Sequence, residues 1–90
     1  MVLVQFRVTV TDADRFKAAF EKWHDAFDED GAQDQRLYQS ESDQNEITMM
    51  AEWESHDAMM ESSDKHGDEF QADAGTEGLA WETRIWHRLT

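Results

Sequence analysis

Three side chains of this 90-residue sequence have the chemistry that a site for an aromatic alcohol requires. The imidazole of His66 titrates near neutral pH and can act as a general base. It lies at helical spacing from Met59 and Phe70, and therefore close to apolar side chains. Tyr38 and Arg84 can orient a phenolic or enolic oxygen by hydrogen bonding. His66 also fits a second interpretation, a partly buried histidine with a structural hydrogen bond.

Aromatic and methionine side chains at strand and helix spacings are candidates to line an apolar cavity beneath the helices. They are Phe6, Phe20, Trp23, Met49, Trp53, Met60 and Phe70. Methionine adapts its shape, and a pocket rich in methionine and tryptophan suits a flat aromatic ligand. The same spacings are also typical of a solid hydrophobic core, so both interpretations stay open at this stage.

Other kinds of chemistry lack their signatures in this sequence. His24 and Asp28 form an i, i+4 pair, but Glu21 and Asp25 surround them, and this pattern favours a solvated acidic helix face. A metal site needs at least three converging ligands. There is no cysteine, and there is no phosphate loop, dinucleotide fingerprint, nucleophile elbow or zinc-peptidase motif. We therefore predict no metal and no cofactor.

The charge balance limits the partners that the chain can have. Eight Lys and Arg residues against 21 Asp and Glu residues give a formal net charge of −13, which repels phosphate backbones and anionic lipid headgroups. We expect neither nucleic acid nor membrane as a partner. No apolar run spans a bilayer and no signal-peptide pattern is present, so a cytoplasmic location is expected. The acidic composition resembles that of proteins from salt-accumulating halophiles.

Hydrophobic periodicity predicts six elements. Alternation over residues 2–10 indicates a strand, and apolar residues every three or four positions indicate a helix over 12–30, capped by Thr11 or Asp12 and closed by Gly31. Residues 33–41 and 47–53 predict a hairpin around the turn at 42–45. A second helical region follows Ser55 and is ended by Gly75 and Gly78, with an interruption expected at Gly67. Residues 79–89 predict a last strand.

This order predicts an α+β fold of the ferredoxin-like βαββαβ type, in one domain over residues 1–90. Its four-stranded antiparallel sheet has both helices on one face. The other face carries Leu3, Met50 and Trp86 among polar residues, which is too apolar for open solvent. The sheet of a second copy, packed against this face, would remove it from water, so we predict a two-fold homodimer. A small aromatic molecule is the other expected partner.

The order of these signals resembles the dimeric α+β barrel proteins similar to antibiotic biosynthesis monooxygenases, including small cyclase-like and stress-responsive members. The resemblance rests on the helix from Phe16 to Phe27 closed by Gly31, and on the turn at 43–46 that leads into Ile47–Trp53 and then through residues 52–55 into the second helix. Gln44 stands where such turns often have proline. The resemblance implies a ligand pocket between the helices and the sheet of each protomer.

The resemblance implies two functions. The first is binding of a small aromatic or quinol-like molecule. The alternative is cofactor-free monooxygenation, in which a deprotonated phenol or enol gives an electron to dioxygen directly. Haem-degrading members of this family carry Asn on the first strand and Trp and His on the second helix. Here residues 5–7 are Gln, Phe and Arg, residues 55–75 contain no Trp, and only His66 matches. We therefore do not expect haem breakdown.

We predict that the fold depends on salt. The 21 carboxylates repel one another strongly at low ionic strength and are screened in concentrated salt. Dialysis from molar KCl into dilute buffer should abolish the near-UV circular dichroism and the native elution volume. Equal stability in both solutions would contradict the halophilic interpretation.

Overall fold

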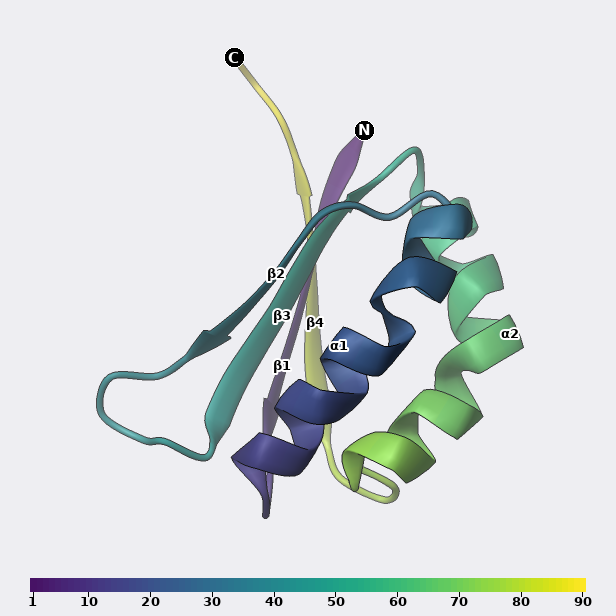
Figure 1. Cartoon of the computed structure of the whole chain (residues 1–90). Coiled ribbons are helices and arrows are strands. Elements are labelled where there is room, and N and C mark those ends of the chain that lie inside the picture. The colour runs from purple at the N-terminus through teal and green to yellow at the C-terminus, as the bar shows by residue number, and fades with distance from the viewer.

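The computed structural model describes all residues, 1–90, and confirms the predicted order of elements (Figure 1). The first strand is followed by a helix, two consecutive strands, a second helix and a final strand. The elements are β1 (Val2–Thr9), α1 (Ala13–Glu29), β2 (Gln33–Gln39), β3 (Glu46–Trp53), α2 (His56–Ala74) and β4 (Trp81–His87). This is the ferredoxin-like βαββαβ fold that the periodicity predicts.

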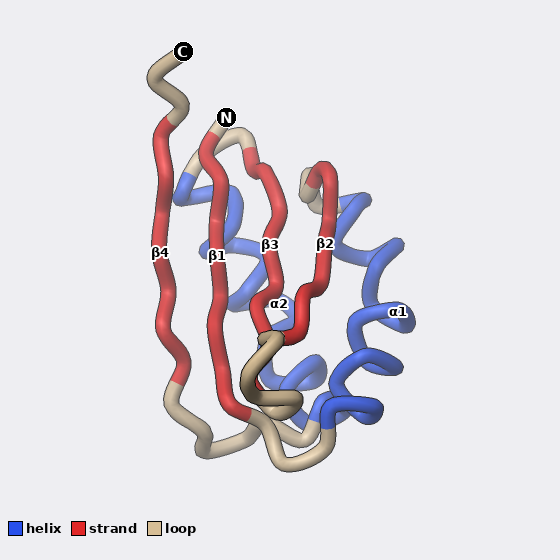
Figure 2. The backbone as a smooth tube through the Cα atoms, turned by 90° about the vertical axis from the view of Figure 1, so that its left-hand side faces the viewer, coloured by secondary structure: helices blue, strands red, loops and turns tan.

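The four strands form one antiparallel sheet in the order β2-β3-β1-β4. Val4 at the centre of β1 lies opposite Ala51 of β3 and Ile85 of β4, so apolar residues of the three strands share one face. Both helices cover that face, and Figure 2 shows the sheet in front with no helix over its other side. We call this uncovered side the open face.

Side-chain caps and glycines determine where the helices begin and end. Asp12 caps α1 by accepting a 3.0 Å hydrogen bond from the backbone N of Arg15, and Ser55 caps α2 through the backbone N of Ala58 at 3.1 Å. Gly75 ends α2 with φ of +73°, a left-handed conformation that glycine adopts without strain. Neither helix combines the length and apolar composition needed to cross a bilayer.

The interruption predicted at Gly67 is wrong, because α2 continues through it to Ala74. A glycine inside a helix lowers stability by about 1 kcal/mol relative to alanine. Met59, Phe70 and Ala74 on the same helix are buried against the rest of the protein. Their burial, roughly 1.5–3 kcal/mol for each large side chain, outweighs the weak helix propensity of one glycine.

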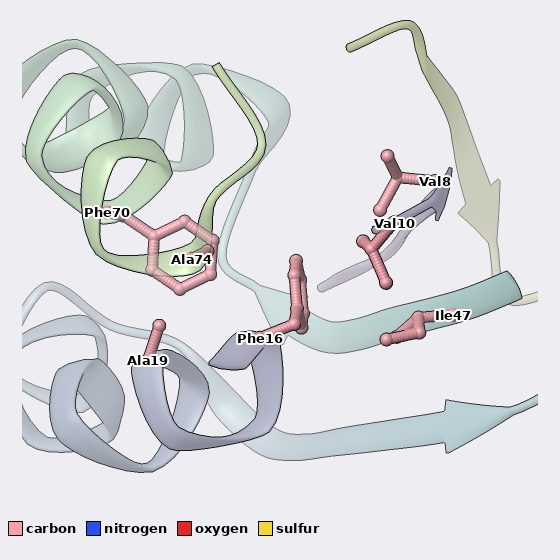
Figure 3. Close-up of a cluster of buried hydrophobic side chains, with 7 residues drawn as sticks. All are labelled: Val8, Val10, Phe16, Ala19, Ile47, Phe70 and Ala74. Atoms are coloured by element: carbon pink, nitrogen blue, oxygen red, sulfur yellow. The ribbon is translucent and has the colours of Figure 1, made fainter. Parts of the chain in front are cut away.

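The buried core is divided into two clusters at opposite ends of β1. Figure 3 shows the first cluster, whose members come from both helices, β1, β3 and the residue after β1: Val8, Val10, Phe16, Ala19, Ile47, Phe70 and Ala74. The second contains Val2, Val4, Ala32, Trp53 and Met59. Phe6 and Met49, which lie between these ends on neighbouring strands, are only partly buried. The middle of the layer is therefore the least completely filled part.

Polar contacts hold α1 against the end of α2. The Arg15 guanidinium donates to the backbone oxygens of Asp73 (3.0 Å) and Ala72 (2.8 Å). The Asp73 carboxylate accepts hydrogen bonds from Lys22 Nζ at 2.8 Å and Trp23 Nε1 at 2.7 Å. These hydrogen bonds, that of Lys22 first, hold the pKa of Asp73 below its usual value. The carboxylate therefore joins the two helices while charged.

Candidate functional site

A cavity of about 240 Å³ lies between the two helices and the sheet, where the two core clusters meet. Most of its walls are apolar and come from five of the six elements and the residue before β2: Val4, Phe6, Phe20, Phe27, Ala32, Met49, Met50, Ala51, Trp53, Met59, Phe70 and Trp81. The remaining wall residues are Gln35, Ser62, Ser63, Gly67, Asp68, Gln71 and Thr83. The arrangement suits an apolar ligand with a polar end.

The cavity contains most, but not all, of the aromatic and methionine residues predicted to line it. Phe6, Phe20, Met49, Trp53 and Phe70 are wall residues. The two others lie elsewhere. The Trp23 indole donates to Asp73 and stacks between the helices, and Met60 points outward with 46% of its surface exposed.

His66, the predicted base, lies between the helices rather than in the cavity wall. Its Nε2 is 3.2 Å from an Asp30 carboxylate oxygen, and only 19% of its side chain is exposed. Its ring centroid is 5.3 Å from that of Trp23 and 6.1 Å from that of Phe27. Gly67, the next residue, does line the cavity. Successive helical residues point about 100° apart, and this rotation turns His66 toward α1.

Asp30 is the centre of this interhelical contact. Besides His66, its carboxylate accepts a 2.8 Å hydrogen bond from Ser62 Oγ and one of 3.4 Å from Lys65 Nζ. Burial on its own raises the pKa of Asp30, but the Ser62 hydrogen bond and the charge of Lys65 outweigh it and hold the pKa below its ordinary value. No group of three or more His, Asp or Glu side chains is placed to hold a metal ion.

Tyr38 and Arg84 are on the open face, on the other side of the sheet from the cavity. Tyr38 lies opposite Thr48, and its hydroxyl accepts a 3.3 Å hydrogen bond from Arg36. Arg84 lies opposite Gln5 and binds Glu82 at 3.3 Å. The structure therefore does not bring His66, Tyr38 and Arg84 together. Strand alternation explains this, because side chains one position apart, such as Thr83 and Arg84, point to opposite faces.

The polar residues of the cavity wall were not predicted from the sequence. Gln35 reaches it through a β-bulge between Gln33 and Arg36, where Asp34 has a positive φ of 52°. A bulge cannot be predicted from hydrophobic periodicity, because the extra residue interrupts the alternation of the strand. Gly67 did carry a signal, since a glycine in the middle of a helix often has a packing or functional reason.

Three polar residues of the cavity wall have side chains that bind no other group of the protein. Asp68 and Gln71 of α2 and Thr83 of β4 line the cavity and make no side-chain hydrogen bond or ion pair within the protein. Asp68, Thr83 and the neighbouring Ser63 are solvent-exposed. The cavity therefore opens between α2 and the edge strand β4, and we call Asp68, Gln71 and Thr83 the polar rim.

Comparison with known proteins adds a family and a set of similar folds. A family model described as antibiotic biosynthesis monooxygenase matches residues 1–72. A search among curated proteins found no match. Among solved structures, a candidate antibiotic biosynthesis monooxygenase from Bordetella bronchiseptica has a TM-score of 0.84 at 17% identity, over 99% of this chain and 97% of its own. SnoaB from Streptomyces nogalater, a cofactor-independent oxygenase, has a TM-score of 0.79 at 21% identity, over 99% and 93%. At these identities the structural similarity establishes the fold alone.

We predict that Asp30→Ala destabilises the protein by about 1–3 kcal/mol, because it leaves the buried Ser62 hydroxyl without its acceptor. Urea unfolding at neutral pH measures this, with Asp28→Ala, an exposed position on the same helix, as the control. The folded pKa of Asp30 is lowered, so its contribution is present above the ordinary value of 3.8 and is lost as the pH falls through the folded value. The urea unfolding curves of the wild-type protein and of Asp30→Ala should therefore converge in acid. A neutral-pH difference below about 0.5 kcal/mol would contradict the role of Asp30.

Proposed function

Because this chain belongs to the antibiotic biosynthesis monooxygenase family, we propose that it binds a small aromatic or quinol-like molecule in the cavity between its helices and its sheet. The observation that carries the proposal is the composition of the wall, which consists mostly of aromatic, methionine and other apolar side chains and includes a few polar ones. Flat aromatic molecules with one polar end match such a wall, because their rings replace water against apolar surface.

The size of the cavity limits the ligand to one or two rings. An engineered apolar cavity of about 150 Å³ holds benzene. The cavity here, about 240 Å³, accommodates one substituted ring or two small fused rings. A larger multi-ring ligand would need α2 to move away from the sheet.

Gly67 supports the proposal because it keeps this space open. A Cβ built on Gly67 meets no atom within 4 Å, although the residue is in the middle of α2 and lines the cavity. Alanine at this position would improve helix propensity by about 1 kcal/mol. The glycine therefore lowers helix propensity at a wall position where a side chain would enter open space rather than contact packed neighbours. A loss of stability of this kind is common at binding sites.

We predict that hydroquinones or flat phenols quench the tryptophan fluorescence in molar KCl, with saturation near one ligand per protomer, because Trp53 and Trp81 line the cavity. Haem, also in the panel, should give no specific response. Gly67→Leu should weaken binding at least tenfold by filling the space. Gly67→Ala should stay folded and gain about 0.5–1 kcal/mol. Ala72→Leu, on the exposed side of α2, is the control and should bind normally.

Absence of quenching by every member of the panel would contradict the proposal and leave the cavity as a packing defect. Binding that survives Gly67→Leu unchanged would place the ligand elsewhere on the protein.

The second candidate function is cofactor-independent oxygenation of a phenolic or enolic substrate. It is supported by the family and by the fold shared with SnoaB. In this reaction the pocket supplies desolvation, orientation and a base. With His66 held against Asp30, the titratable side chain on the cavity wall is Asp68. Oxygen uptake with the ligands that quench fluorescence separates this candidate from binding alone, since a binding protein consumes none.

We also propose that two copies pair through their open faces. Trp86 on this face is 50% exposed, and Leu3 lies beside it on β1. Several charges there are already paired within the protomer, since Arg7 binds both Glu46 and Glu82. Paired charges are less unfavourable to cover than isolated ones. We further propose that the protein comes from a salt-accumulating organism, because its composition is strongly acidic. A cytoplasmic location is proposed with it, since such organisms hold the salt inside the cell.

Trp86→Asp should therefore convert a dimer into a monomer, because it places a charge in the middle of the apolar part of the open face. Sedimentation at micromolar concentration in molar KCl measures the mass. Met60→Asp changes a comparably exposed side chain on α2 and should leave the dimer intact. A wild-type protein that sediments as a monomer would refute the pairing.

A further inference from the structure

The polar rim restricts the chemistry of the ligand beyond its aromatic ring. We propose that the cavity selects an aromatic molecule whose polar end donates hydrogen bonds, as a hydroxyl or an ammonium group does, and rejects one that ends in a carboxylate or a phosphate. This inference rests on the proposed binding function and specifies the ligand class for the same site.

The charge of the wall is the first observation. Asp68 is the only charged residue among those that line the cavity, and no Lys or Arg is part of the wall. Lys65 and His66, the basic residues that precede Asp68 on α2, both contact Asp30 on the side that faces α1. Arg84, next to Thr83 in sequence, is on the open face. A ligand anion at the polar rim would therefore meet a carboxylate with no cation to offset it.

The second observation is that the rim has free acceptors. The carboxylate of Asp68, the side-chain oxygen of Gln71 and the hydroxyl of Thr83 bind no other protein group. Other polar side chains of the wall are already engaged: Ser62 donates to Asp30, and Gln35 donates to the backbone oxygen of His24. An ionised carboxylate only accepts hydrogen bonds, so the strongest available partner at this rim calls for a donor.

The effect of Asp68 can be separated from that of the overall charge of −13. In molar salt the Debye length is about 3 Å, so charges farther away on the protein have little effect on a bound ligand. An ammonium or carboxylate in direct contact with Asp68 is screened much less, because protein and ligand exclude the salt. Discrimination that persists in molar KCl therefore reports the local contact.

Three probes of matched size test the inference: 2-phenylethylamine, 2-phenylethanol and phenylacetate, titrated by calorimetry in molar KCl near neutral pH. In the wild-type protein, the amine and the alcohol should each bind at least tenfold more tightly than phenylacetate. Asp68→Asn should reduce the advantage of the amine over phenylacetate at least fivefold, and Asp68→Lys should reverse their order. Asp64→Asn is the control, because Asp64 is exposed one turn earlier on α2, outside the cavity wall, and should change nothing.

The outcomes distinguish this inference from the proposed function. If phenylacetate binds as tightly as the alcohol, or if Asp68→Lys leaves the ranking unchanged, the donor preference is overturned while aromatic binding stands. If neither these probes nor the hydroquinone panel bind, both proposals fail together. An equal response of Asp64→Asn and Asp68→Asn would assign the preference to general charge and overturn the role of the rim.

Discussion

The pairing of β1 with a neighbour on each side determines most of what this protein can do. Because β1 is bound in register to β3 and β4, each of its residues has a fixed partner and a fixed face. Val4 joins Ala51 and Ile85 under the helices, while Arg7 on the opposite side joins Glu82. A slip of one residue would exchange these two faces. The register therefore sets the floor of the cavity and the ion pairs of the open face at once.

The cavity follows from how the two helices are held over that floor. Polar contacts join the helices at two places, through Asp73 near the end of α2 and through Asp30 at the end of α1. Between these places, Phe20 and Phe27 of α1 and Gly67 of α2 line the cavity, and Gly67 has no side chain to fill it. A chain of 90 residues has little apolar volume with which to fill the layer completely. The polar contacts thus fix the helices to each other at these two places, and the cavity lies beneath the stretch between them.

The architecture could be predicted from the sequence because it depends on periodicity and on caps, and both are local. The elements and the caps at Asp12 and Ser55 follow directly from residue types. The site could be predicted only in part. Strand parity, which was already visible in the sequence, places Tyr38 and Arg84 with the open face rather than the cavity. The contact between His66 and Asp30 joins residues 36 positions apart, and the bulge that delivers Gln35 to the wall leaves no periodic trace. Both depend on tertiary packing.

The chemistry of the rim bears on the choice between binding and oxygenation. Direct electron transfer to dioxygen starts from a phenolate or enolate, an anion that the rim would place near the carboxylate of Asp68. If a carboxylate takes the proton itself, the transfer runs uphill, because an ordinary phenol and an ordinary carboxylic acid differ by about 6 pKa units, which is about 8 kcal/mol. Only a substrate far more acidic than phenol reduces that difference. If the cavity binds its ligand as proposed, the carboxylate of Asp68 favours the protonated form of that ligand. The proposal of binding is therefore more consistent with this rim than the proposal of oxygenation.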